Sequence, residues 1–257
     1  GDSDFDNMKG FAKANGFDYV HDQKSFPYDT PKNMWGVFDE YVFNYAGSLI
    51  DKADAPTFIT LFTTTNHQPW QVPVSRESLI PHFEHLVAEH PQILRTMAYT
   101  DHAIGEYFKH NDQKEWMDNT LFVFISDHGI NVFQDQFEDP RNAHIPFLIY
   151  GLEFISKPQT ISRYVSQVDV APTILHIIGY PDSFQFMGSN VIDEFNHSFS
   201  CRTVNDYTIW IEENFILTTI LNKKSSLGKF TSIYDIPYFI TDNKVVTKIF
   251  FFLSILK

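Results

Sequence analysis

Hydrophobic and polar positions separate most clearly within residues 121–130, whose sequence is LFVFISDHGI. The five apolar residues 121–125 form a continuous run, which is typical of a strand covered on both faces in a parallel or mixed sheet. Residues 126–129, Ser-Asp-His-Gly, end the run. Because ligands bind where the strands of such sheets end, the pattern predicts a buried strand with a functional site at its carboxyl end.

A second apolar run, residues 57–62 (TFITLF), predicts another strand that also leads into a polar loop containing a histidine, His67. Between the two runs, from about residue 81 to 110, apolar residues at helical spacing predict one long helix. Strand, helix and strand would form a right-handed βαβ unit. This arrangement would bring His67 near Asp127 and His128 at one edge of the sheet.

The predicted helix carries a carboxylate on its apolar face. At helical spacing, Asp101 falls in line with the apolar residues of that face. A carboxylate in such surroundings needs a hydrogen bond or a nearby charge, so we expect Asp101 to anchor the helix to the sheet. The predicted face consists of Leu94, Met97, Asp101, Ile104 and Phe108.

Shorter stretches of the sequence predict further helices and strands, which together indicate an α/β organisation. A helix is expected over residues 39–50, and another after Asp169, which can cap a helix. His144 stands at the start of a further apolar run, residues 145–150, which predicts a strand. Beyond about Phe199, short β-like stretches separated by turns predict an antiparallel C-terminal part.

The charge of the chain narrows the classes of partner. Its 257 residues include 32 acidic and 19 basic side chains, which gives a net charge of -13. Because the chain lacks a basic stripe to neutralise phosphates, its charge argues against nucleic-acid binding, and an anionic substrate needs a metal or a few placed cations. The single cysteine, Cys201, excludes an internal disulfide and a cysteine-based metal cluster.

Asp127 and His128 are candidate metal ligands. An adjacent carboxylate and imidazole can both reach one divalent cation, and Gly129 lets the backbone turn sharply beneath it. An oxygen with a nitrogen suits zinc, manganese or iron better than calcium. The alternative is a turn that only caps the strand.

The other two histidines have structural alternatives as well. His67 can be a loop residue held by Asn66 and the backbone, and His144 can be structural because it precedes its strand. The three threonines 63–65 offer hydroxyl groups, but the sequence shows no neighbouring base that would activate one as a nucleophile.

Five motifs, in the same order along the chain, resemble the sulfatase-like branch of the alkaline phosphatase superfamily. The likeness is greatest to the membrane-anchored lipoteichoic acid synthases and phosphoglycerol transferases. It covers residues 1–192, predicted to be the C-terminal part of the catalytic domain, whereas residues 193–257 are predicted to be a β-rich appendage of the same domain. The motifs are TLFTTTNHQPW, TDHAIGEYF, DNTLFVFISDHG, HIPFLIYG and SQVDVAPTIL.

The resemblance implies an α/β three-layer fold of the alkaline phosphatase type, a mixed sheet with helices on both faces, truncated at its N-terminus. It implies one divalent metal, manganese first and zinc or magnesium as alternatives, held by Asp127 and His128. It also implies that His67 is catalytic and contacts the substrate, and that His144 lies close to the substrate.

By the same resemblance, the intact enzyme is expected to be a metal-dependent phosphoglycerol transferase or phosphodiester hydrolase at the extracytoplasmic face of the cell envelope. Its substrate would be an anionic, lipid-linked or glycerol-phosphate-type molecule. Two rivals remain. One is a sulfate-ester hydrolase, whose C-x-P-x-R motif is absent around Cys201. The other is a non-catalytic remnant that acts as a binding or structural module.

In that family a threonine nucleophile and a glutamate ligand lie upstream of the segment that matches residues 1–8, GDSDFDNM. The first residue here is Gly1 rather than Met. We therefore expect that the nucleophile, the glutamate ligand and the membrane-anchoring helices precede this chain. Alone, residues 1–257 are expected to bind metal weakly and to show no turnover.

Overall fold

The structure is a computed structural model, and it describes residues 1–81, 91–130, 140–193, 199–204, 206–220, 225–229 and 238–240. The chain forms two compact units, Gly1–Met117 and Asp118–Lys257. The predicted division between residues 192 and 193 remains a prediction. Within the described ranges, no helix is both long enough and apolar enough to cross a membrane.

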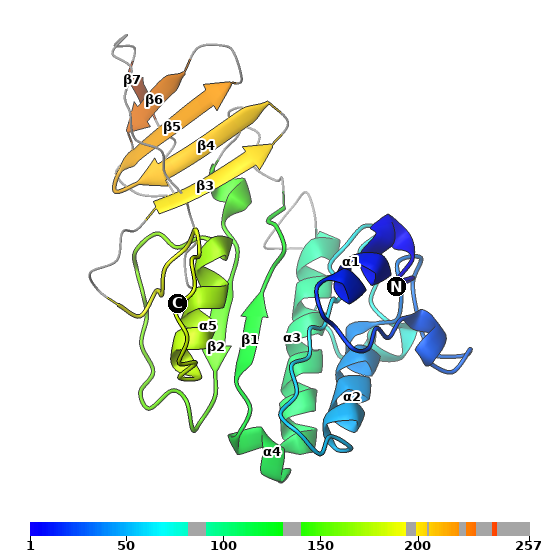
Figure 1. Cartoon of the computed structure of the whole chain (residues 1–257). Helices are drawn as coiled ribbons and strands as arrows, with labels where there is room; N and C mark the ends of the chain where they lie inside the picture. The colour runs from blue at the N-terminus through cyan, green and yellow to red at the C-terminus, as the bar shows by residue number, and fades with distance from the viewer. Residues whose placement is uncertain are drawn as a thin grey trace. The chain divides into compact units, whose positions relative to one another are not determined.

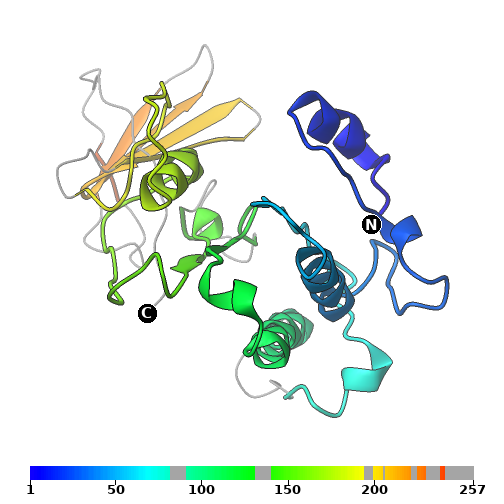
Figure 2. The same cartoon turned by 60° about the horizontal axis from the view of Figure 1, so that its bottom comes forward.

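The first unit is built mainly on two helices that lie side by side, α2 (Asp39–Ile50) and α3 (Pro91–Asn111) (Figures 1 and 2). Tyr99 and Tyr107 of α3 pack against Phe38 and Phe43, with 6.1 Å between ring centroids in each pair. Tyr99 is fully buried. The unit also contains α1 (Met8–Ala14) and most of α4 (Glu115–Asp118).

Helix α3 confirms the long helix over Pro91–Asn111, while residues 82–90 of the predicted helix lie outside the described residues. The predicted apolar face is wrong, because Asp101 is exposed and anchors nothing in the core. Packing of the tyrosine rings against α2 decides the orientation, and a hydrophobicity pattern undervalues tyrosine because of its hydroxyl. The buried face includes Thr96, Tyr99, Ala103 and Tyr107.

The predicted strand at residues 57–62 is also wrong. The segment has no regular secondary structure, and Phe58 is 74% exposed. A strand needs a neighbour for its backbone groups, and β1 (Phe122–Ile125) pairs instead with β2 (Phe147–Tyr150) in antiparallel register, Val123 opposite Ile149. The expected βαβ unit is therefore absent from the described residues.

In the second unit, β1 and β2 pack with α5 (Val170–Ile177) around a cluster that includes the buried Phe147 and Val165. Tyr164, the residue before Val165, packs against a second cluster of buried residues. The buried residues of this cluster belong to a five-stranded antiparallel sheet. This sheet confirms the antiparallel C-terminal part, although residues 241–257 lie outside the description. Its strands are β3 (Phe199–Val204), β4 (Tyr207–Glu212), β5 (Phe215–Ile220), β6 (Ser226–Lys229) and β7 (Tyr238–Ile240), in that order (Figure 1).

Two glycines give a matched test of the α2–α3 packing. A Cβ at Gly47 would lie 3.3 Å from Cε2 of Tyr107, whereas a Cβ at Gly105 would meet nothing within 4 Å. We expect Gly47→Leu to lower the free energy of unfolding by about 1–3 kcal/mol through overpacking. Gly105→Leu should raise it by about 0.5–1 kcal/mol through helix propensity. Urea unfolding measures both, and equal effects would contradict the close packing.

Candidate functional site

The loop after β1 holds Asp127 and His128 in a defined local geometry. The backbone N–H of His128 donates to Oδ1 of Asp127 over 2.9 Å. Nδ1 of His128 lies 2.8 Å from the carbonyl oxygen of Gly129. A carbonyl oxygen only accepts, so Nδ1 must carry the proton, and Nε2 of the neutral ring keeps its lone pair. That Nε2 lies 3.6 Å from the other carboxylate oxygen, Oδ2 of Asp127.

This arrangement fits a divalent cation. Two donor atoms on one tetrahedral ion, each about 2.1 Å from it, lie about 3.4 Å apart, close to the separation seen between Nε2 and Oδ2. Donation of the second ring N–H to a backbone carbonyl is also the usual way in which proteins orient a metal-bound histidine. The side chains of Asp127 and His128 are 58% and 74% exposed, so an ion can reach both.

The backbone around this pair is held from two sides. The side-chain amide of Gln167 donates to the carbonyls of Ser126 and Asp127, at 3.0 and 2.7 Å. A Cβ at Gly129 would lie 2.0 Å from the carbonyl oxygen of Asn142, so only glycine allows the two segments to approach this closely. In the part of the chain that is described, no group of three or more His, Cys, Asp or Glu side chains is arranged to hold a metal.

His144 belongs to the segment that packs on this loop, since its carbonyl oxygen would lie 3.5 Å from a Cβ at Gly129. The structure thus brings the backbone of the His144 segment against the loop of Asp127 and His128. The role of the His144 side chain remains a prediction. The side chain is half-buried, and desolvation lowers the pKa of its imidazole. A neutral ring suits hydrogen bonding to a substrate oxygen better than charge pairing with it.

His67 lies in the first unit, whereas the three other predicted site residues lie in the second. Its approach to Asp127 therefore remains a prediction. The ring is exposed, its Nδ1 is 3.0 Å from the carbonyl oxygen of Gln68, and its centroid is 4.2 Å from that of Trp35. Trp35 donates its indole N–H to the same carbonyl over 2.5 Å.

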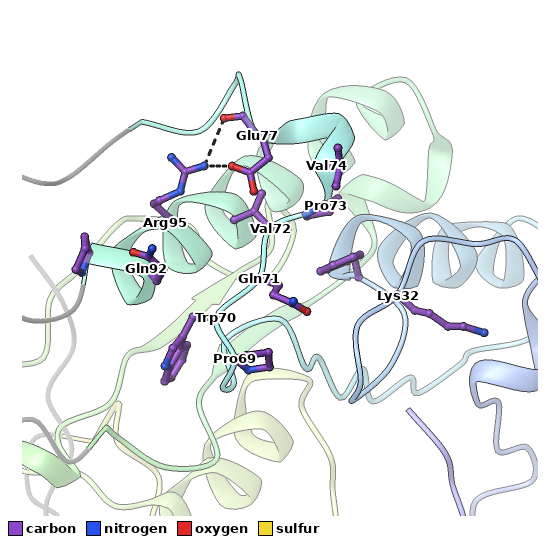
Figure 3. A pocket seen from close by; sticks show the side chains of 12 residues that line it. Lys32, Pro69, Trp70, Gln71, Val72, Pro73, Val74, Glu77, Gln92 and Arg95 are labelled. Atoms are coloured by element: carbon purple, nitrogen blue, oxygen red, sulfur yellow. Dashed lines mark hydrogen bonds and ion pairs between the residues drawn. The ribbon is translucent and has the colours of Figure 1, made fainter.

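The first unit contains a cavity of about 720 Å³, and the residues that come directly after the His67 loop in the chain help to line it (Figure 3). Pro69 and Trp70 line it, and the backbone N–H of Trp70 donates to the carbonyl of His67 over 2.9 Å. Arg95 also lines the cavity, and it is bound to the Glu77 carboxylate. The cavity is therefore lined by an indole from the residue three positions after His67, while His67 itself is not among its lining residues.

Two further residues, Trp35 and Asp39, support the His67 loop. No pattern in the sequence identifies either of them as part of the site. Trp35 covers the ring, as described above. Asp39 reads in the sequence as the acidic start of a helix, yet its side chain is fully buried and binds the hydroxyls of Thr65 and Thr100. Only the three-dimensional approach of these distant segments reveals that role.

A sequence profile of the sulfatase family matches residues 1–180. The chain is 25% identical over 161 residues to the lipoteichoic acid synthase-like protein YvgJ of Bacillus subtilis, an alignment that covers 56% of this chain and 26% of that protein. It is 29% identical over 212 residues to an ulvan-active sulfatase of Formosa agariphila, which covers 67% of this chain and 41% of that protein.

Among solved structures, a protein of the alkaline phosphatase superfamily from Vibrio parahaemolyticus is similar with a TM-score of 0.81 and 25% identity, over 95% of this chain and 59% of that one. This similarity confirms the predicted α/β fold of the alkaline phosphatase type. The chain spans about a quarter to two fifths of the length of the two curated relatives.

The burial of His144 predicts an acid-shifted titration. Because desolvation lowers its folded pKa below the unfolded value of about 6.5, the neutral form is favoured on folding. The free energy of unfolding is therefore unaffected by the protonation of His144 above the unfolded pKa. It falls as pH drops through the folded pKa, because the buried ring must then take up a charge. NMR titration of the His144 ring, in the native chain and in urea, measures both values. A folded midpoint at or above the unfolded one would contradict the burial.

Proposed function

We propose that this chain, which belongs to the sulfatase family, carries part of the active site of a metal-dependent phosphoglycerol transferase or phosphodiester hydrolase. The observation that carries the proposal is the lone pair on Nε2 of His128, which the Gly129 carbonyl preserves, 3.6 Å from Oδ2 of Asp127. The relatives named as lipoteichoic acid synthases support the choice of a phosphoglycerol group over other esters.

Asp127 and His128 would hold the ion, manganese first and zinc or magnesium as alternatives. When bound, such an ion supplies a Lewis acid that stabilises negative charge on a phosphoryl oxygen and lowers the pKa of a coordinated hydroxyl. Asp127 contributes charge, and the loop backbone held by Gln167 keeps both ligands in place before the ion arrives.

His67 would act on the substrate through Nε2. Its Nδ1–H is engaged by the Gln68 carbonyl, so Nε2 is the nitrogen that faces the substrate. In the imidazolium form, with both nitrogens protonated, Nε2–H would donate to a phosphate oxygen or protonate the leaving alkoxide. The Trp35 ring limits the orientations that the imidazole can adopt. His144, kept neutral by burial, would add a hydrogen bond to a substrate oxygen.

The substrate would be anionic, lipid-linked or of the glycerol-phosphate type, and nucleic acid is not a partner. With a net charge of -13, the chain surface repels anions, so the attraction would come from the ion held by Asp127 and His128. By likeness to the lipoteichoic acid synthases, we place the intact protein at the extracytoplasmic face of the cell envelope, associated with the membrane.

A sulfate-ester hydrolase is the second candidate, and the ulvan-active sulfatase favours it because the similarity extends over 67% of this chain. The same loop geometry would serve a sulfuryl oxygen, since sulfate and phosphate esters share their tetrahedral shape. A non-catalytic binding module is the third candidate, and a folded chain without affinity for metal at Asp127 and His128 would favour it.

The test uses the protein produced from its native gene, supplied with Mn²⁺. We expect release of diacylglycerol from phosphatidylglycerol vesicles and no sulfate from 4-nitrophenyl sulfate. His67→Ala should lower the rate by about 10²–10⁴-fold through loss of proton transfer. Asp127→Asn should abolish the Mn²⁺-dependent turnover. The exposed Asp182→Asn serves as the matched control and should leave the rate unchanged.

Two outcomes would overturn the proposal. Sulfate release without diacylglycerol would support the sulfatase. No turnover of either substrate, together with no Mn²⁺-induced broadening of the His128 NMR signals, would support the non-catalytic module.

A further inference from the structure

Asp39, the first residue of α2, is a buried carboxylate whose partners, among the residues that the structure describes, are hydroxyl groups and backbone amides rather than a cation. Desolvation raises the pKa of its carboxyl group, and hydrogen bonds from Thr65 and Thr100 oppose that shift. Burying a carboxylate without a cation costs stability, and an apolar residue would fill the same space at less cost. Asp39 therefore needs an explanation other than stabilisation of the core.

One carboxylate oxygen holds the start of the His67 loop. The hydroxyl of Thr65 donates to Oδ1 of Asp39 over 2.5 Å, and the Thr65 backbone N–H donates to the same oxygen over 3.3 Å. In return, the backbone N–H of Asp39 donates to the Thr65 hydroxyl oxygen over 3.3 Å. Thr65 is thereby clamped to the N-terminus of α2, two residues before His67.

The other carboxylate oxygen reaches the same loop through α3. The hydroxyl of Thr100 donates to Oδ2 of Asp39 over 2.7 Å. The side-chain amide of Asn66 donates to that hydroxyl oxygen over 2.9 Å. The carboxylate thus fixes both Thr65 and Asn66, the two residues immediately before His67, and it ties them to two different helices.

Beyond His67 the loop is held by Trp35. Its indole N–H and Nδ1 of His67 converge on the Gln68 carbonyl, and the two rings lie 4.2 Å apart. The histidine therefore sits between an anchor set by Asp39 and an aromatic cover. Displacing the anchor should move the imidazole relative to the indole.

We propose that Asp39 is a positioning residue for His67, which sets the place of the imidazole through Thr65 on one carboxylate oxygen and through Thr100 and Asn66 on the other. The inference rests on the proposed function, in which His67 acts on the substrate. Because a displacement of about 1 Å can cost 10²-fold in rate, the anchor matters for catalysis without any contact to the substrate.

Asp39 and Thr65 also form a carboxylate–hydroxyl pair, which is the composition of a base and a nucleophile. Both residues are 0% exposed, so no substrate can reach the Thr65 hydroxyl. The pair therefore positions the loop and does not attack the ester.

The experiment compares Asp39→Asn and Thr100→Val with the exposed Asp54→Asn as the matched control. Asp39→Asn keeps the shape and removes one acceptor. Thr100→Val removes the hydroxyl that joins Asn66 to Oδ2 of Asp39 and leaves the contacts of Thr65 with Oδ1 in place. NMR follows the nuclear Overhauser contact between the Trp35 and His67 rings, and the ring signals of Tyr99 and Tyr107 report on the α2–α3 core.

We expect both variants to lose most of the Trp35–His67 contact while the tyrosine signals stay in place, and Asp54→Asn to change neither. In the native protein, kcat should fall about 10- to 10²-fold for both variants, with KM little changed. If Asp39→Asn fails to fold, Thr100→Val decides alone. An unchanged His67 environment in a folded Thr100→Val chain would overturn the inference.

Failure of the proposed function gives a different result. If the rings separate as expected but His67→Ala leaves turnover unaltered, Asp39 positions His67 and His67 is not the residue that acts on the substrate.

Discussion

A carbonyl oxygen can accept a hydrogen bond but cannot donate one, and this constraint determines the chemistry of two histidines at the proposed site. His128 gives its Nδ1–H to Gly129, and His67 gives its own to Gln68. In each case the carbonyl of the following residue occupies Nδ1, so Nε2 is the nitrogen left for a ligand. At His128 its lone pair is available to an ion, and at His67 it meets the substrate as N–H when the ring is doubly protonated. The functional nitrogen is therefore chosen by local backbone geometry, before any ligand binds.

Charge is organised in opposite ways around these two histidines. The carboxylate of Asp127 is open to solvent beside His128, where an ion can compensate its charge. The carboxylate of Asp39 is closed off, and hydroxyls and amides satisfy it instead. An exposed carboxylate can exchange water for a metal, whereas a buried one can only hold what folding has placed around it. The first suits binding, and the second suits positioning.

What the sequence predicted correctly was local. The apolar run before Asp127 became β1, although this strand is only partly buried and pairs antiparallel rather than in a parallel or mixed sheet, and the family motifs pointed to the correct fold. What it predicted wrongly depended on distant partners. Residues 57–62 had the composition of a strand, but a strand exists only where a neighbour accepts its backbone hydrogen bonds.

The predicted orientation of α3 was wrong for a related reason. Tyr99 and Tyr107 turned inward because their rings fit against α2, which moved Asp101 to the surface. Asp39 took the anchoring role that the helical pattern had assigned to Asp101. No pattern within one segment could reveal this, because its partners, Thr65 and Thr100, lie 26 and 61 residues away in the sequence.

The most direct test of the central claim is the tautomer of His128, read from the two-bond ¹⁵N–¹H correlations of its ring in the metal-free chain at neutral pH. The predicted result is a protonated Nδ1 and an unprotonated Nε2. A ring protonated at Nε2 would contradict it, because the lone pair that is to meet the ion beside Asp127 would then be absent.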